Sequence, residues 1–239
     1  MKMSLEDSLN KIRGFILARY QDNLAAILIF GSANTGHFRE GKSDIDTILL
    51  LKRQQNINFN KEIKFLLEAL KSEHFATQYF YTLIGIKKHI RERGSWSTYI
   101  TIVSEDGSKV LYSTPEFEKT RKWLEDNPPT AEAIKKYLHE KDKFELDGYF
   151  EDIKNFELTK GFLGHFRRKL QIINYFSRGV LIFDYNTCLN NIRLSKEEKE
   201  RLKRLYNAYL ERKGLSDEEV QNYDDFAKKL TTKISKEFL

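Results

Sequence analysis

The sequence contains little cysteine, proline or glycine, and each shortage excludes a class of protein. Cys188 is the single cysteine, so neither an internal disulfide nor a multi-cysteine zinc site can form. With 12 glycines and 3 prolines among 239 residues, the chain is neither collagen-like nor of low complexity. A hydrophobic content of 40%, including 13% aromatic residues, instead supports packed cores.

The sequence also lacks long apolar runs. No stretch approaches the roughly 20 apolar residues that a membrane-spanning helix needs. Residues 1–15, MKMSLEDSLNKIRGF, contain no apolar segment of the signal-peptide type. Together with the single cysteine, this predicts a cytoplasmic protein in a reducing environment and no membrane partner.

The charge of +6 is spread evenly over the chain. Residues 1–127 carry 19 basic and 16 acidic side chains, and residues 128–239 carry 22 and 19, so each part has a net charge of +3. A basic tail or a strongly basic half would indicate nucleic-acid binding. An even spread is more typical of a solvated surface, so nucleic acid is a partner that we keep open without favouring it.

The three prolines fall within residues 115–129 and separate two kinds of pattern. Before them, apolar runs and helical periodicity alternate. We predict strands and helices there over 4–20 (helix), 25–30 (strand), 44–51 (strand), 61–71 (helix), 74–83 (strand) and 109–112 (strand). After them, strand signals nearly vanish and apolar residues recur at helical spacing. We predict helices over 130–155, 158–178, 195–213 and 216–238.

This pattern predicts two domains of different class. Residues 1–114 should form an α/β (α+β) domain with a short mixed sheet flanked by helices. Residues 115–129 should be a linker, and residues 130–239 an all-helical bundle that serves as a substrate or partner domain.

Two aspartates at the start of the second strand form the most informative feature. Asp44 and Asp46 stand two residues apart, so their side chains point to the same face of the strand. Neighbouring carboxylates repel, and a divalent cation removes that cost. Mg²⁺ prefers oxygen ligands and is commonly held by one or two carboxylates together with substrate phosphates.

A Gly-Ser turn ends the preceding apolar strand. Glycine at position 31 lets backbone approach a phosphate closely, and Ser32 adds a hydroxyl to successive N–H groups. A metal site beside a phosphate cradle is the equipment for in-line phosphoryl-type transfer.

The segment ILIFGSANTGHFREGKSDIDTILLL, residues 27–51, resembles the signature of the polymerase-β-like nucleotidyltransferase superfamily. The order of elements is similar to its antibiotic-modifying and minimal members with a helical C-terminal domain. The resemblance implies that Gly31 and Ser32 hold the triphosphate and that Asp44 and Asp46 are catalytic and bind Mg²⁺, with two ions admissible. We keep Ser43 among the candidate nucleotide-binding residues, although a serine at such a place is more often a turn residue than a ligand. ATP or another nucleoside triphosphate would be the donor.

The sequence departs from the family pattern at one point. Many members place a third carboxylate on the next long strand, but no Asp or Glu stands between Phe75 and Leu83, where Thr77, Gln78 and Tyr79 occupy the expected place. Either two carboxylates suffice, or activity is lost, or an acid of the helical domain completes the site as catalytic base. The candidates for that role are Glu140, Glu145 and Glu151.

We therefore expect an enzyme that transfers a nucleoside monophosphate, AMP from ATP in the first instance, with release of pyrophosphate. The acceptor would be a hydroxyl of a small molecule or a protein, and an RNA end is less favoured. The alternatives are a catalytically impaired module that binds nucleotide or a partner, and a nucleic-acid-binding regulator. The spacing of Arg and His in residues 130–239 argues against a fused ribonuclease toxin. A homodimer is compatible with the sequence.

Overall fold

The computed structural model describes residues 4–36, 38–40, 43–55, 57–150, 152–153 and 155–239. It divides the chain into two compact units. The first, here the sheet unit, comprises Met1–Arg91 and Thr98–Pro128, and the second, the helical unit, comprises Glu92–Ser97 and Pro129–Leu239. A sheet with flanking helices is followed by a helical region, which confirms the predicted fold class.

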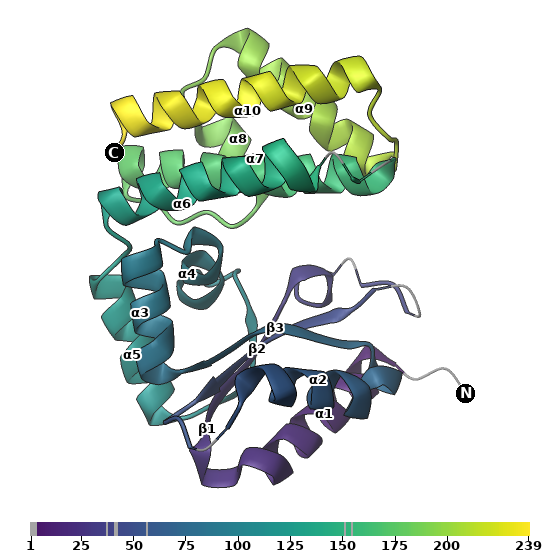
Figure 1. The fold of residues 1–239 in the computed structure, drawn as a ribbon, viewed down its shortest axis with the longest axis vertical. Helices are drawn as coiled ribbons and strands as arrows, with labels where there is room; N and C mark the ends of the chain where they lie inside the picture. The colour runs from purple at the N-terminus through teal and green to yellow at the C-terminus, as the bar shows by residue number, and fades with distance from the viewer. Residues whose placement is uncertain (1–3, 37, 41–42, 56, 151, 154) are drawn as a thin grey trace. The chain divides into compact units, whose positions relative to one another are not determined.

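The sheet unit is built on four strands in the order β3-β2-β1-β4 (Figure 1). They are β1 (Leu24–Phe30), β2 (Ile45–Leu51), β3 (Phe75–Thr82) and β4 (Lys109–Ser113). β1 pairs antiparallel with β2 and β4, whereas β2 and β3 run parallel, so the sheet is mixed. Residues 24–29 of β1 are fully buried, as the unbroken apolar run of this segment predicts.

Two helices, α1 (Leu5–Tyr20) and α2 (Phe59–Ala69), cover one face of this sheet (Figure 1). Their buried side chains share one core with alternate residues of the two central strands. This core includes Leu9, Ile12, Ile16, Ile27, Ile29, Ile45, Leu49 and Leu66. A reciprocal capping box between Ser4 and Asp7 begins α1. The unit also contains most of α3 (Leu83–Arg93) and α4 (Trp96–Val103), whose residues 92–93 and 96–97 belong to the helical unit. Its remaining elements are α5 (Pro115–Asp126) and the short helices η1 (Gln21–Asn23), η2 (Gly31–Ala33) and η3 (Lys71–Glu73).

The segment 115–129, predicted as a linker, instead contains α5, which belongs to the sheet unit and contacts β1. Phe117 and Leu124 on this helix are fully buried. The reason lies in Pro115, which occupies the first turn of α5, where its fixed φ suits the helix and its missing N–H costs nothing. Pro115, which we placed in a linker, therefore starts a helix.

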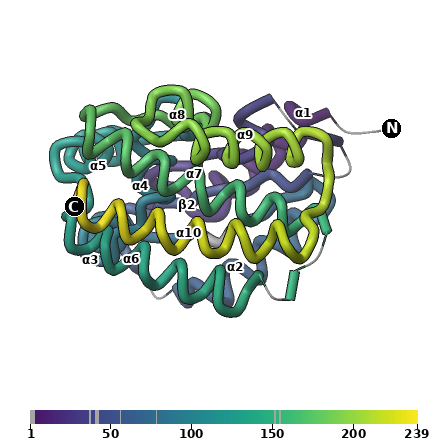
Figure 2. The backbone as a smooth tube through the Cα atoms, turned by 90° about the horizontal axis from the view of Figure 1, so that it is seen from above, coloured from purple at the N-terminus to yellow at the C-terminus, as the bar shows by residue number. Residues whose placement is uncertain are grey.

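The helical unit consists of α6 (Ala131–Phe144), the π-helical segment η4 (Glu145–Tyr149), α7 (Phe156–Arg178), α8 (Tyr185–Asn191), α9 (Lys196–Leu210) and α10 (Asp217–Glu237). α7 is the central helix: α8, α9 and α10 all contact it (Figure 2). Reciprocal capping boxes start α9 at Ser195 and α10 at Ser216. The helix predicted over 130–155 is shorter, because its helical path changes to η4 after Phe144. α8 was not predicted.

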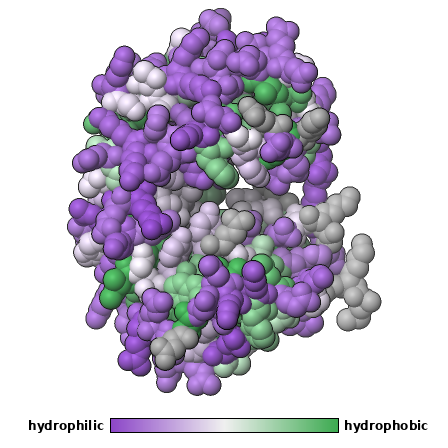
Figure 3. Space-filling model, in the orientation of Figure 1, coloured by the Kyte–Doolittle hydropathy of each residue, from purple (hydrophilic) through white to green (hydrophobic). Residues whose placement is uncertain are grey.

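The surface matches the charged composition. On the face shown in Figure 3, hydrophilic residues dominate and apolar residues form small groups. Within the ranges given above, no helix is long and apolar enough to cross a membrane.

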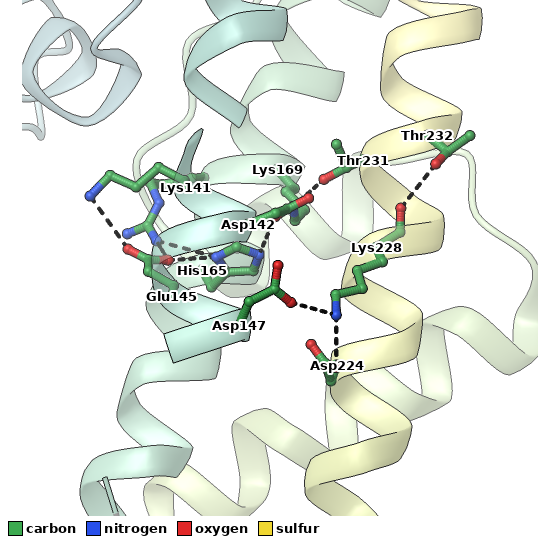
Figure 4. A network of polar contacts seen from close by, with 11 residues as sticks. Lys141, Asp142, Glu145, Asp147, His165, Lys169, Asp224, Lys228, Thr231 and Thr232 are labelled. Carbon is green, nitrogen blue, oxygen red and sulfur yellow. Dashed lines mark hydrogen bonds and ion pairs between the residues drawn. The ribbon is translucent and has the colours of Figure 1, made fainter. Parts of the chain in front are cut away.

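A buried polar network ties the helical unit together (Figure 4). Lys169 on α7 is completely buried, and its ammonium group lies 2.6 Å from Asp142 Oδ1 on α6 and contacts the hydroxyl of Thr231 on α10. Burial lowers the pKa of Lys169 to about 8 despite the nearby carboxylate. A buried charge needs such partners, so this lysine joins three helices.

His165 connects the same network to η4. Its Nδ1 lies 2.5 Å from Glu145 Oε2, and its Nε2 lies 3.0 Å from Asp142 Oδ1. Arg168 also contacts Glu145, and Lys141 Nζ lies 3.5 Å from the other oxygen of that carboxylate. Burial by itself would raise the pKa of Glu145, but the hydrogen bond to His165 and the charge of Arg168 outweigh it and lower this pKa to about 2.

We predict that Glu145→Gln destabilises the protein by about 3 kcal/mol at pH 7, because it leaves the partly buried guanidinium of Arg168 without its counter-charge and disturbs the buried contact with His165. The folded-state pKa of Glu145 lies below the ordinary value of 4.5, so its stabilising effect is present above that value. The effect is lost as the pH falls from 4.5 toward 2, so the difference in unfolding free energy between the variant and the wild type should narrow in that range. Urea unfolding between pH 7 and pH 3 measures the size of this difference and its dependence on pH.

Glu140→Gln is the matched control for this prediction. Glu140 is exposed on α6, and its carboxylate lies 3.9 Å from Lys136 Nζ, a surface pair worth well under about 1 kcal/mol. Equal unfolding free energies for the two variants would contradict a stabilising role for the network.

Candidate active site

The pairing of β1 with β2 brings the Gly-Ser turn against an aspartate. Phe30, the last residue of β1, is the cross-strand partner of Asp46, so Gly31 leaves the sheet directly beside the Asp46 carboxylate. A Cβ atom built on Gly31 would lie 2.5 Å from Asp46 Oδ2, and Gly31 has a φ of +66°. Both the left-handed backbone and the close approach require glycine at this position.

The turn after Gly31 is held by its own backbone. The N–H groups of Asn34 and Thr35 each donate to the Gly31 carbonyl oxygen at 3.1 Å. The amide side chain of Asn34 donates to the carbonyl oxygen of Asp106 at 3.0 Å, which anchors the turn to the chain before β4. Ala33 is buried in the core, and Ser32 lies half-buried between Gly31 and Ala33. The N–H groups at the start of such a helical turn have no partner within it.

The two aspartates lie at the start of β2. Asp44 is exposed and immediately precedes the strand, and Asp46 is its second residue and half-buried. The residue between them, Ile45, is fully buried in the core on the opposite face, as the alternation of a strand requires. Both carboxylates therefore belong to the face of the sheet that α1 and α2 leave uncovered.

Ser43 closes the loop that leads into β2. Its hydroxyl accepts a hydrogen bond from the Arg39 N–H at 3.0 Å, and its own N–H donates to the Arg39 carbonyl oxygen at 2.9 Å. These contacts support the turn role that we kept as the alternative for this residue. Ser43 thereby fixes where Asp44 leaves the loop.

The neighbouring strand β3 carries no carboxylate beside Asp46. Ala76 is the residue of β3 aligned with Asp46. Thr77 is buried on the other face, where its hydroxyl donates to the Thr47 carbonyl oxygen at 2.8 Å. Thr77 therefore does not occupy the place that we predicted for it. The Gln78 side chain lies outside what the structure describes.

Tyr79 returns to the face of the aspartates. The register of β3 shifts between Thr77 and Tyr79, so Tyr79 aligns with Ile48, two residues after Asp46 on the same face. Its ring meets the ring of Phe30 edge-on, with centroids 5.8 Å apart. Because Phe30 is paired with Asp46, this aromatic pair flanks the carboxylate.

The acids that we considered in the helical unit differ in environment. Glu145 is buried and engaged by His165, Arg168 and Lys141, which favours a structural role over proton transfer. Glu140 is exposed. Glu151 lies outside the described residues.

The residues at the start of β2 fit a hard divalent cation. Two carboxylates on one face, one exposed and one half-buried, offer the oxygen ligands that Mg²⁺ prefers. The absence of a Cβ at Gly31 lets the Asp46 carboxylate pack directly against the backbone of the turn, which brings these oxygens beside the Gly-Ser segment. Among the residues that the structure describes, no group of three His, Cys, Asp or Glu side chains is arranged to hold a metal.

The mixed sheet places a Gly-Ser turn against a strand that begins with Asp-x-Asp, and a helical region follows in the sequence. These features define a polymerase-β-like nucleotidyltransferase fold. The family model described as "Nucleotidyltransferase domain" matches residues 9–160, well over half of the chain. The chain belongs to this nucleotidyltransferase family.

A solved structure supports the fold over nearly the whole chain. A spectinomycin adenyltransferase from Enterococcus faecialis, crystallised with ATP and spectinomycin, is similar to this chain with a TM-score of 0.60 and 13% sequence identity. The similarity covers 95% of this chain and 99% of that protein, so it extends through both units. A comparison with curated protein sequences gave no match.

We predict that Gly31→Ala weakens Mn²⁺ binding at least about tenfold, because the added methyl group collides with the Asp46 carboxylate that would bind the ion. Isothermal titration with Mn²⁺ measures this change. Gly36→Ala is the matched control, since Gly36 also has a positive φ, +75°, but a Cβ there meets nothing within 4 Å.

Both substitutions should cost about 1–2 kcal/mol of stability through backbone strain. If they weakened Mn²⁺ binding equally, loop strain rather than contact with Asp46 would be the cause, and the close approach at Gly31 would not matter for binding.

Proposed function

We propose that this protein is a Mg²⁺-dependent nucleotidyltransferase that transfers AMP from ATP to a hydroxyl group and releases pyrophosphate. The observation that carries the proposal is the approach of the Gly31 backbone to the Asp46 carboxylate. This contact puts a place for phosphate oxygens and a place for a cation side by side. Membership in the nucleotidyltransferase family supports nucleotidyl transfer in general.

Each residue has a role in this proposal. Asp44 and Asp46 hold Mg²⁺, which neutralises charge on the triphosphate and on the reacting oxygens when it is bound. The backbone of Gly31 and the N–H and hydroxyl groups of Ser32 seat the triphosphate. Ser43 sets the position of Asp44 by closing the loop with Arg39. The acceptor oxygen then forms a bond to the α-phosphorus as the bond to pyrophosphate breaks, and the hydroxyl proton leaves to solvent.

A small molecule is the acceptor that we favour. The structural neighbour was crystallised with ATP and spectinomycin, and its similarity covers 95% of this chain. A hydroxyl-bearing antibiotic of this kind is therefore the first acceptor to test. A protein hydroxyl is the second acceptor, and it would be recognised by transfer of labelled AMP to protein in a cell extract.

The competing function is a module that binds nucleotide without transferring it. The lack of an Asp or Glu on β3, with Ala76 aligned to Asp46, is the observation that favours it. Tight binding of ATP and Mg²⁺ with no pyrophosphate released across a panel of acceptors would support this alternative.

We predict that Asp44→Asn and Asp46→Asn each lower the rate of pyrophosphate release by about 100-fold or more, since bound metal contributes several kcal/mol to transition-state stabilisation. Asp22→Asn serves as the control, because Asp22 is exposed at the opposite end of β1. A coupled pyrophosphate assay with spectinomycin and other hydroxyl-bearing antibiotics measures the rate. Wild-type turnover by either site variant would overturn the proposed function.

A further inference from the structure

Asp46 has a neighbour on each side within the sheet. On β1 the paired residue is Phe30, and on β3 the aligned residue is Ala76. Aligned residues on adjacent strands place their side chains on the same face, about 5 Å apart. The side chains next to Asp46 are therefore an aromatic ring and a methyl group, and neither offers the oxygen ligand that Mg²⁺ prefers.

The register of β3 determines which residue of this strand lies beside Asp46. Thr77 is buried on the opposite face, with its hydroxyl bound to the Thr47 carbonyl oxygen, and cannot point toward Asp46. The register shift then brings Tyr79 back to the face of the aspartates, against Phe30. A phenol is a poorer ligand for Mg²⁺ than the carboxylates that this ion commonly binds.

A second cation would add positive charge to this face. In sites that hold two metal ions, the ions lie about 3.5–4 Å apart and repel, and anionic ligands from the protein and the substrate offset this repulsion. Here Asp44 and Asp46 provide two carboxylates, and at the described residues no third His, Cys, Asp or Glu joins them in a metal-binding group.

We propose that this enzyme binds a single divalent cation together with its nucleotide, and that Ala76 marks the position whose side chain decides between one ion and two. This inference rests on the proposed function, since it concerns the same Asp44–Asp46 site. The bound cation accompanies the triphosphate, and the β3 strand supplies no carboxylate to a second ion or to the acceptor proton.

Native mass spectrometry of the full-length chain with Mn²⁺ and α,β-methylene ATP tests the proposal, because it counts ions in each protein–nucleotide complex. We expect one Mn²⁺ per complex for wild type and two for Ala76→Asp, whose carboxylate would stand beside Asp46. Ala76→Ser is the control and should stay at one ion, since it adds an oxygen without charge. Circular dichroism checks that each variant is folded, and Ala76→Glu is the second variant should Ala76→Asp not fold.

The outcomes separate this inference from the proposed function. Two ions bound to the wild type would overturn the single-ion proposal, while the nucleotidyltransferase proposal would stand. A wild type that binds neither nucleotide nor Mn²⁺ would overturn both. If folded Ala76→Asp and Ala76→Glu both retained a single ion, position 76 would not be the place of the missing ligand.

Discussion

The site depends on one close contact, that of the Gly31 backbone with the Asp46 carboxylate. It exists because Phe30 and Asp46 are paired across two antiparallel strands, so that the chain turns out of the sheet beside the acid. A side chain at position 31 would lie 2.5 Å from a carboxylate oxygen. The pairing register and the absence of a Cβ thus act together, and a shift of β2 by one residue would turn Asp46 into the core.

The surrounding structure holds this contact in place. Buried residues of β1 and β2 pack on α1 and α2, which fixes the two strands relative to each other. The hydrogen bonds that Asn34 and Thr35 make to Gly31, and those between Ser43 and Arg39, fix the two ends of the loop between the strands. The helical unit is stabilised separately, through the buried charges around Lys169 and His165.

Much of the fold and the position of the candidate site could be predicted from the sequence, because both follow from patterns of residues close together in the chain. The unbroken apolar run of β1, the helical spacing of apolar residues after the prolines, and the Asp-x-Asp pair predicted the fold class and the candidate site. Features that depend on pairing could not be predicted. That Ala76 rather than Thr77 aligns with Asp46 follows from the register of β3, and that Glu145 is engaged by His165 follows from packing of α6 and η4 on α7. Pro115 misled because proline both ends and begins helices.

The most direct test of the account is a crystal structure of the protein with α,β-methylene ATP and Mg²⁺. We predict that the triphosphate lies on the Gly31–Ser32 turn and that oxygens of Asp44 and Asp46 bind the Mg²⁺ that also contacts it. A nucleotide bound elsewhere, or a cation held without Asp46, would contradict the claim that the contact between Gly31 and Asp46 creates the active site.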